Sequence, residues 1–173
     1  MNAATFWNLL KRTKEVSAGD GHKQAELLYK ALLELSADDI LSYYIILTQL
    51  IDRAYSWDLW AAAHIINCGT GDDGFTDFRA WLICQGEYTF NQVLKDPELL
   101  VNIVEYPPDT MIEELGFYAP LEAYEEKTGH LLPDFPYEPA EISGEKWEEE
   151  DLRKKYPKLW TKFGDCSYMF GTT

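Results

Sequence analysis

A stripe of apolar side chains between residues 37 and 55 constrains the fold of this chain more than any other feature of the sequence. Its members are spaced mainly three and four positions apart: Ile40, Tyr43, Tyr44, Leu47, Leu50, Ile51 and Ala54. That spacing places them on one face of a helix, whereas a strand would alternate apolar and polar residues. Shorter stripes of the same kind recur along the chain, and no alternating segment of useful length interrupts them. We therefore predict an all-α protein, a single-domain array of about seven to nine helices.

The chain of 173 residues suits one domain. We expect that domain to span residues 1–164, with its core in residues 37–100. Three prolines in residues 130–146 predict an extended arm, and its large apolar side chains predict that the arm lies on the surface instead of moving as a free linker. The candidate anchors of the arm are Leu131, Leu132, Phe135 and Tyr137. C-terminal helices are expected in residues 147–163, followed by a frayed tail at 165–173.

Capping and turn residues predict where the helices begin and end. The residues expected to cap helix N-termini are Thr5, Asp20, Ser36, Ser56, Asp72 and Asp96. A longer helix is predicted from Asp109 to Thr128, and Pro120 should kink it near Gly116 because proline removes one amide donor. Gly129 then supplies the residue type that commonly ends a helix.

The net charge of −15 is unevenly distributed along the chain. Residues 105–151 contain 15 acidic and 2 basic residues, whereas residues 152–173 contain 5 basic and 1 acidic residue. A nucleic-acid-binding protein needs a basic face to displace counterions from phosphates, so we expect no nucleic-acid partner. The acidic segment would attract a basic protein and speed the encounter. The alternative is that the same charge only keeps the protein soluble.

The sequence also indicates a compartment. No apolar run approaches the roughly 18 residues of a membrane span, so we expect no membrane partner. The N-terminus lacks the basic and apolar regions of a secretory signal. The cysteines Cys68, Cys84 and Cys166 are odd in number and widely spaced, which disfavours a disulfide framework. We therefore predict a cytoplasmic protein.

Metal and cofactor signals are weak. His64 and Cys68 lie four positions apart, a spacing that can place two ligands on one metal ion. A zinc site needs about two more ligands, but the other histidines are distant and no CxxC motif occurs. Cys84 is expected at the end of a helix, where the helix dipole disfavours a thiolate nucleophile. The Gly-Thr-Gly turn after Cys68 lacks the lysine and the preceding strand of a phosphate loop. We predict neither a metal nor a cofactor.

The weak candidates for catalysis lie around the turn between two Trp-rich helices: His64, Asp72, Asp73 and Arg79. Helix capping by Asp72 and a favourable interaction of Asp73 with the helix dipole explain both aspartates without catalysis. An arginine on an apolar helix face needs a partner, and we predict that Asp58 forms a partly buried salt bridge with Arg79. Asp52 and backbone carbonyls at helix ends are the rival partners.

The same stretch is first of all a candidate for a packed helix–turn–helix unit. The residues expected to build this unit are Trp57, Asp58, Trp60, Asp72, Phe75, Phe78, Arg79 and Trp81. Its motifs WDLWxAA, from Trp57, and DDGFxxFRxWLxxxG, from Asp72, resemble the bacterial domain of unknown function 4240 family. The similarity is dense over residues 38–100 and looser over 109–163. That family has no established activity, so the resemblance implies an organisation and a bacterial host and no particular chemistry.

These observations lead to one expected function and one alternative. The expected function is that of an acidic, cytoplasmic bacterial protein that acts through protein–protein interaction, as a regulatory or immunity-type partner of a basic protein. The alternative is an enzyme or a small-ligand-binding domain with a site near His64, Asp72, Asp73 and Arg79. Because no convergent catalytic set occurs in the sequence, an enzyme is the less expected of the two.

Overall fold

A computed structural model describes residues 1–166 of the chain and confirms the all-α prediction. Within this range the chain forms nine α-helices, two short 3-10 helices and no strand. The elements in chain order are α1 (Ala3–Ser17), α2 (Gly21–Leu33), α3 (Ala37–Arg53), α4 (Trp57–Ile66), α5 (Asp72–Cys84), α6 (Glu87–Val93), η1 (Pro97–Asn102), η2 (Glu113–Leu115), α7 (Tyr118–Thr128), α8 (Glu149–Lys155) and α9 (Pro157–Phe163).

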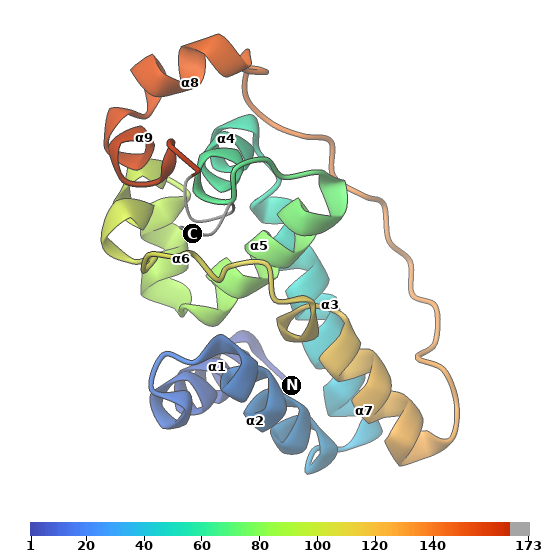
Figure 1. Ribbon diagram of the computed structural model, residues 1–173. Coiled ribbons are helices and arrows are strands. Elements are labelled where there is room, and N and C mark those ends of the chain that lie inside the picture. Colours follow the sequence, from blue (N-terminus) through green and yellow to red (C-terminus); the bar gives the residue numbers. More distant parts are fainter. Residues whose placement is uncertain (167–173) are drawn as a thin grey trace.

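The helices are arranged around α5. α1 and α2 form a hairpin at one end of the molecule, and α7 packs against both α2 and α3 (Figure 1). α8 and α9 lie at the opposite end, where α9 contacts α4 and η1. α5 lies between the two ends and contacts α1, α3 and α4. This central position explains why 8 of the 13 residues of α5 are buried.

The apolar stripe of α3 faces the core as its spacing predicts. Ile40, Tyr43 and Leu47 are fully buried, whereas Tyr44 is half-buried at the edge of the stripe. Tyr43 packs on Phe6 of α1 with 4.7 Å between ring centroids. Burying one such large side chain contributes about 1.5–3 kcal/mol, so this contact adds to the packing of α1, which also forms a hairpin with α2.

Several helix boundaries follow the predicted caps. Asp20, Ser36 and Ser56 each accept an amide hydrogen bond in the first turn of their helices, which satisfies a donor that has no intrahelical partner. Asp96 also caps, although the element that it begins is a 3-10 helix. Gly129 ends α7 in the left-handed conformation that glycine adopts at little cost.

Two predicted caps are wrong. Asn2, and not Thr5, caps α1, and its side chain accepts a hydrogen bond of 2.9 Å from the Thr5 amide. Gly71 is the N-cap of α5, and Asp72 is already the first helical residue. In that position the carboxylate of Asp72 still interacts favourably with the helix dipole.

The helix predicted from Asp109 to Thr128 is also wrong in its extent. The chain forms only the short η2 before Gly116, and α7 begins at Tyr118. Pro120 therefore lies in the first turn of α7, where helix amides have no intrahelical acceptor and a proline costs little. Pro120 thus helps to begin a helix instead of kinking a longer one.

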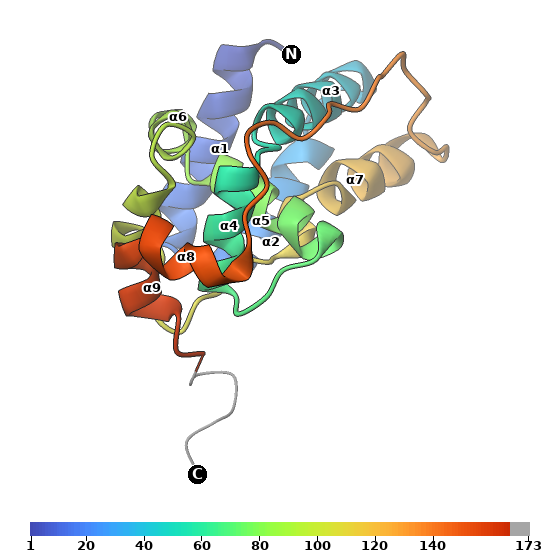
Figure 2. The same ribbon diagram turned by 90° about the horizontal axis from the view of Figure 1, so that it is seen from above.

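The arm predicted at residues 130–146 runs without helix from the end of α7 to α8, and it passes beside α3 (Figure 2). The ring of Phe135 meets Tyr44 edge-on at 5.9 Å, and the Tyr137 hydroxyl donates a 2.8 Å hydrogen bond to Asp52. Leu132 is half-buried, but Leu131 is 78% exposed, so its predicted role as an anchor is wrong.

The arm also reaches the first Trp-rich helix. Ser143 forms an isolated parallel bridge with Ser56. The Ser143 amide donates to the Tyr55 carbonyl at 3.1 Å, and its own carbonyl accepts from the Trp57 amide at 2.9 Å. These backbone bonds fix the arm directly before α4 begins.

A disulfide corrects the prediction drawn from the cysteines. Cys68, after α4, is bonded to Cys166, after α9, with 5.6 Å between their Cα atoms. Cys84 remains a free and buried thiol. Because 98 positions separate the bonded pair, spacing alone could not indicate that α9 docks beside α4. The predicted frayed tail otherwise falls on residues 167–173, which lie outside the described residues.

Candidate functional site

The two Trp-rich helices pack through a continuous series of rings. Trp57 stacks on Trp60 with 5.4 Å between centroids and 9° between planes, and Trp60 stacks on Phe75 of α5 at 5.0 Å. The indole N–H of Trp60 donates a 2.8 Å hydrogen bond to the carbonyl of Thr70, in the turn between the helices. Trp81 packs on Phe78 at 5.5 Å further along α5. This stretch is therefore filled by its own side chains.

Arg79 is enclosed by α3 and α5. Its guanidinium lies 4.7 Å from the ring centroids of both Tyr55 and Phe75. It donates to the carbonyls of Ile51 and Phe75 at 3.0 and 3.3 Å and to the Thr76 hydroxyl at 3.0 Å. Burial lowers the pKa of Arg79 from its ordinary value. Three of its five N–H donors are used internally, so Arg79 joins the end of α3 to the start of α5.

The predicted salt bridge between Asp58 and Arg79 is wrong. Asp58 instead accepts 2.7 Å hydrogen bonds from the Lys155 ammonium and from the Tyr156 hydroxyl. Burial raises the pKa of Asp58, but these two hydrogen bonds outweigh that effect and leave the pKa below its ordinary value. Asp58 therefore holds the C-terminal helices on α4. Arg79 instead donates to backbone carbonyls, which were the alternative partners predicted for it.

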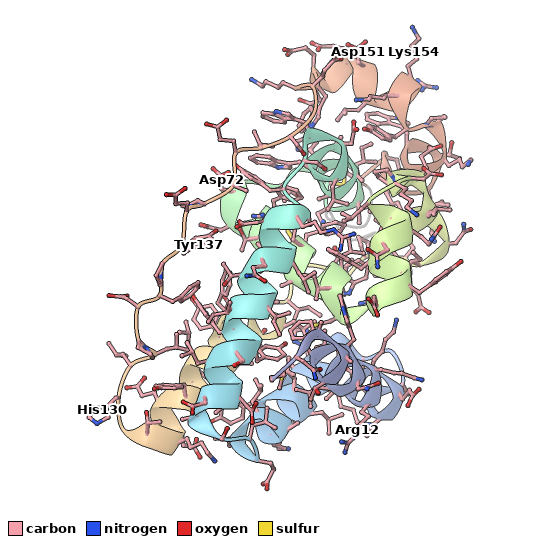
Figure 3. All side chains as sticks on the ribbon, turned by 180° about the vertical axis from the view of Figure 1, so that it is seen from behind. Arg12, Asp72, His130, Tyr137, Asp151 and Lys154 are labelled. Carbon is pink, nitrogen blue, oxygen red and sulfur yellow. A yellow bond between two sulfur atoms is a disulfide. The ribbon has the colours of Figure 1, made fainter. Side chains whose placement is uncertain are left out.

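The remaining catalytic candidates do not line any of five cavities found in the part of the chain that the structure describes. His64 is half-buried, its Nδ1 accepts from the Thr70 amide at 3.4 Å, and burial lowers its pKa. Asp72 and Asp73 are exposed in the first turn of α5, and Figure 3 shows Asp72 on the outer surface. None of the five cavities recorded along residues 1–166 is lined by any of the four candidates. The geometry therefore gives no support to an active site at this turn.

No group of three or more His, Cys, Asp and Glu side chains among residues 1–166 is placed to hold a metal ion. None of the helices in the same range is long and apolar enough to cross a membrane.

Sequence reasoning missed two cavities on the α1–α2 side of the molecule. The first, which we call the acidic groove, has a volume of about 510 Å³ and lies between α2, η2 and α7. It is lined by His22, Ala25, Glu26, Tyr29, Glu113, Glu114, Tyr118, Ala119 and Glu122. Ala25 and Glu26 lie four and three positions before Tyr29 on α2, and these three residues form one half of it. The other half depends on how α7 packs against α2, which no local pattern reveals.

The acidic groove has more carboxylates than basic groups along its lining. Glu113, Glu114 and Glu122 are exposed, and no lysine or arginine among the described residues forms an ion pair with them. Burial raises the pKa of the neighbouring Asp77, and the charges of Glu113 and Glu114 raise it further. Tyr29 donates a hydrogen bond to Glu126, and this bond raises the pKa of Tyr29.

The second cavity, which we call the Lys14 cavity, has a volume of about 530 Å³. It lies between the end of α1, the start of α2, the end of α5 and the segment after η1. The charged, amide and aromatic residues of its lining include Lys14, Asp20, Gln24, Trp81, Glu105 and Asp109. His22 lines both cavities, so they adjoin at this residue.

Three of the five basic C-terminal residues have partners far from the acidic groove. Lys155 contacts Asp58, Lys158 lies 3.8 Å from Glu98, and Lys162 donates to two carbonyls of the η1 region at 2.7 and 2.8 Å. We call α8 and α9, with these contacts and the disulfide, the C-terminal clamp. Figure 3 shows Asp151 and Lys154 of α8 at the end of the molecule opposite Arg12 on the α1–α2 hairpin.

Comparison with known proteins adds the family and nothing about chemistry. Searches among curated proteins and among solved structures found no match. The profile of a family described as "Protein of unknown function (DUF4240)" matches residues 1–126, which include the acidic groove and both Trp-rich helices. The arm and the C-terminal clamp lie beyond the matched residues. The match covers most of the chain, and the chain therefore belongs to the DUF4240 family.

Proposed function

We propose that the protein acts by binding another protein, and that the acidic groove receives a basic segment of that partner. The observation that carries this proposal is that three of the four groove glutamates, Glu113, Glu114 and Glu122, form no ion pair with a basic residue among residues 1–166, whereas Glu26 pairs with Lys30 on its own helix. An exposed carboxylate cluster of one sign raises the rate of encounter with a basic surface. Like charges held together in the free protein are relieved when such a partner binds.

The lining of the groove fits basic side chains better than an inorganic cation. Tyr118 is 53% exposed, and Tyr29 and Tyr118 both line the groove beside the glutamates. Lysine and arginine bury their aliphatic stems on such rings while their charged ends reach a carboxylate. A bare metal ion would use the carboxylates alone and leave the rings unoccupied.

The cellular role of the protein and its compartment are part of the same proposal. A regulatory or immunity-type protein that binds a basic partner in the bacterial cytoplasm would use this groove. A cytoplasmic location also implies that the Cys68–Cys166 bond is open there, because reducing compartments keep most thiols reduced. Alkylation of free thiols in intact cells, followed by mass analysis, tests that part. A bond that stays closed in vivo would contradict the cytoplasmic location.

Two charge-matched variants test the role of the groove. The groove variant changes four groove glutamates to glutamine: Glu26, Glu113, Glu114 and Glu122. The control variant makes the same change at four exposed glutamates of the arm and its junction with α8: Glu138, Glu141, Glu145 and Glu148. Each protein is used to capture partners from a host lysate, and the affinity of the captured partner is then measured at two salt concentrations.

We expect a basic partner that binds the control variant as it binds the wild type, and that binds the groove variant at least about tenfold more weakly. Raising the salt concentration should weaken wild-type binding and have less effect on the groove variant, because salt screens the exposed charges. Equal loss of binding in both variants would show that only the net charge matters. Equal binding by both variants would place the interface elsewhere.

A further inference from the structure

We propose that the Lys14 cavity is a binding site for a small zwitterionic molecule of the amino acid class. In this proposal the ligand carboxylate meets the Lys14 ammonium, and the ligand ammonium faces Gln24 and the carboxylates at the mouth of the cavity. This site is separate from the acidic groove and does not depend on the function proposed for it. Its volume of about 530 Å³ lies within the roughly 300–1,000 Å³ range of small-molecule sites.

The first support is the position of Lys14. Its ammonium is partly buried and donates one hydrogen bond of 3.0 Å, to the carbonyl of Gln85 at the end of α5. No carboxylate among residues 1–166 forms an ion pair with it. Burial lowers the pKa of Lys14, as expected for a cation without a counter-ion. Capping α5 uses one of three ammonium hydrogens, so the group can still bind a carboxylate.

The second support is Gln24, which lines the same cavity and is only 3% exposed. Its amide nitrogen donates to the Cys84 carbonyl at 3.2 Å and lies 3.5 Å from two further acceptors of α1. These contacts assign the nitrogen end of the amide, and the oxygen end accepts no hydrogen bond from any described residue. The oxygen keeps contact with solvent, so a ligand ammonium that enters the cavity can reach it and donate to it.

The third support is how burial and charge are distributed over the lining. The inner wall contains Lys14, Gln24 and the buried ring of Trp81. Three exposed residues at the mouth are carboxylates, Asp20, Glu105 and Asp109, and the last of them lies 3.6 Å from the imidazole of His22, which also lines the cavity. One positive group inside and negative groups outside match a ligand with both charges. The apolar wall formed by Trp81 and Val104 leaves room for an aliphatic or aromatic side chain.

The test is an NMR titration of the full-length protein with the common free amino acids, up to about 10 mM, a concentration that saturates a site with a Kd near 1 mM. The signals followed are the Trp81 indole N–H and the side-chain amides of Gln24 and Gln85. Propionate, which has only the carboxylate, and propylamine, which has only the ammonium, are the two comparison ligands. We expect at least one amino acid to shift these signals saturably and more tightly than either comparison ligand.

Variants assign the charges. Lys14→Gln should weaken amino acid binding by about tenfold or more, because a charged hydrogen bond is lost, while Lys11→Gln on the exposed face of α1 should leave binding unchanged. The paired change Glu105→Gln and Asp109→Asn lies at exposed positions and should weaken amino acid binding without weakening that of propionate. No saturable shift with any amino acid would overturn the proposal. So would unchanged binding to a folded Lys14→Gln protein, or propylamine binding as tightly as the best amino acid.

Discussion

The C-terminal clamp and the acidic groove lie at opposite ends of the molecule and use charge in opposite ways. In the clamp, Lys155, Lys158 and Lys162 each have an internal partner. In the groove, the exposed Glu113, Glu114 and Glu122 have no basic partner among the described residues. Paired charges of the first kind stabilise the fold, whereas like charges of the second kind cost stability and attract a partner. Substitutions at the two ends should therefore have effects of opposite sign.

The largest loss of stability is expected when the disulfide of the clamp is removed. A closed loop of about 100 residues contributes about 4.7 kcal/mol in the chain-entropy description, and the bond from Cys68 to Cys166 spans 98 positions. Cys166→Ser should lower the free energy of unfolding in urea by about 2–4 kcal/mol. Reductant should have the same effect on the wild type and no further effect on the variant. A variant as stable as the oxidised wild type would contradict this expectation.

The next largest effect is expected at Arg79. Arg79→Ala should lower the free energy of unfolding by about 3 kcal/mol, since it removes packing between two rings together with three buried hydrogen bonds of the guanidinium. Arg53→Ala is the matched control, because Arg53 also lies over a ring, that of Phe90 at 5.4 Å, but is exposed. We expect this control to cost less than about 1 kcal/mol. Equal costs at the two positions would mean that the enclosure of Arg79 adds nothing.

A smaller and pH-dependent loss is expected at Asp58. Asp58→Asn should lower the free energy of unfolding at pH 7 by about 1 kcal/mol or less, because the carboxylate is half exposed and solvent screens it. The folded pKa lies below the ordinary value of 3.8, so this contribution is present above that pH and is lost as the pH falls below it. Urea unfolding at neutral pH and near pH 3 checks both parts. A difference from the wild type that persists unchanged in acid would contradict the role of the charge.

The smallest effect should have the opposite sign and lie beside the groove. Burial and the charges of Glu113, Asp73 and Glu114 raise the folded pKa of Asp77, so ionised Asp77 costs stability once the pH rises through that pKa. Asp77→Asn should therefore increase the free energy of unfolding at pH 7 by about 0.2–0.5 kcal/mol, the size of one like-charge pair four positions apart on a helix. This increase in the free energy of unfolding should vanish below about pH 4, where Asp77 is protonated in both states. Urea unfolding at the two pH values checks it, and a variant less stable than the wild type at pH 7 would contradict the expectation.

Local features of this fold could be predicted from sequence, because they depend on residues a few positions apart. The stripe of α3 and the caps at Asp20, Ser36 and Ser56 are of this kind. The hydrogen bonds that give other polar residues their roles join positions far apart in the sequence. Asp58 and Lys155 are 97 positions apart, and Lys14 and Gln85 are 71 apart. No periodicity links such residues, because their contact depends on how separate helices pack.

The candidate site illustrates the same limit. Sequence patterns drew attention to Arg79 and to the aspartates of its helix, since charged residues beside an apolar stripe are unusual. In the structure, Arg79 lies over two aromatic rings and donates hydrogen bonds to other groups of the protein, so it contributes to packing. Lys14 and Gln24 drew no attention, because each is an ordinary polar residue at the edge of a helix. Their environment comes from α5 and from the segment after η1, which approach them only in the folded chain.

The bond between Cys68 and Cys166 closes a covalent ring that contains the whole exposed arm. A protease that cuts the arm, for example beside the exposed Leu131, would open this ring without separating the two pieces. The cut protein would migrate as one species until a reductant is added and as two species afterwards. Cleavage in the arm alone would therefore leave the C-terminal clamp tethered to α4, and its release would require cleavage and reduction together.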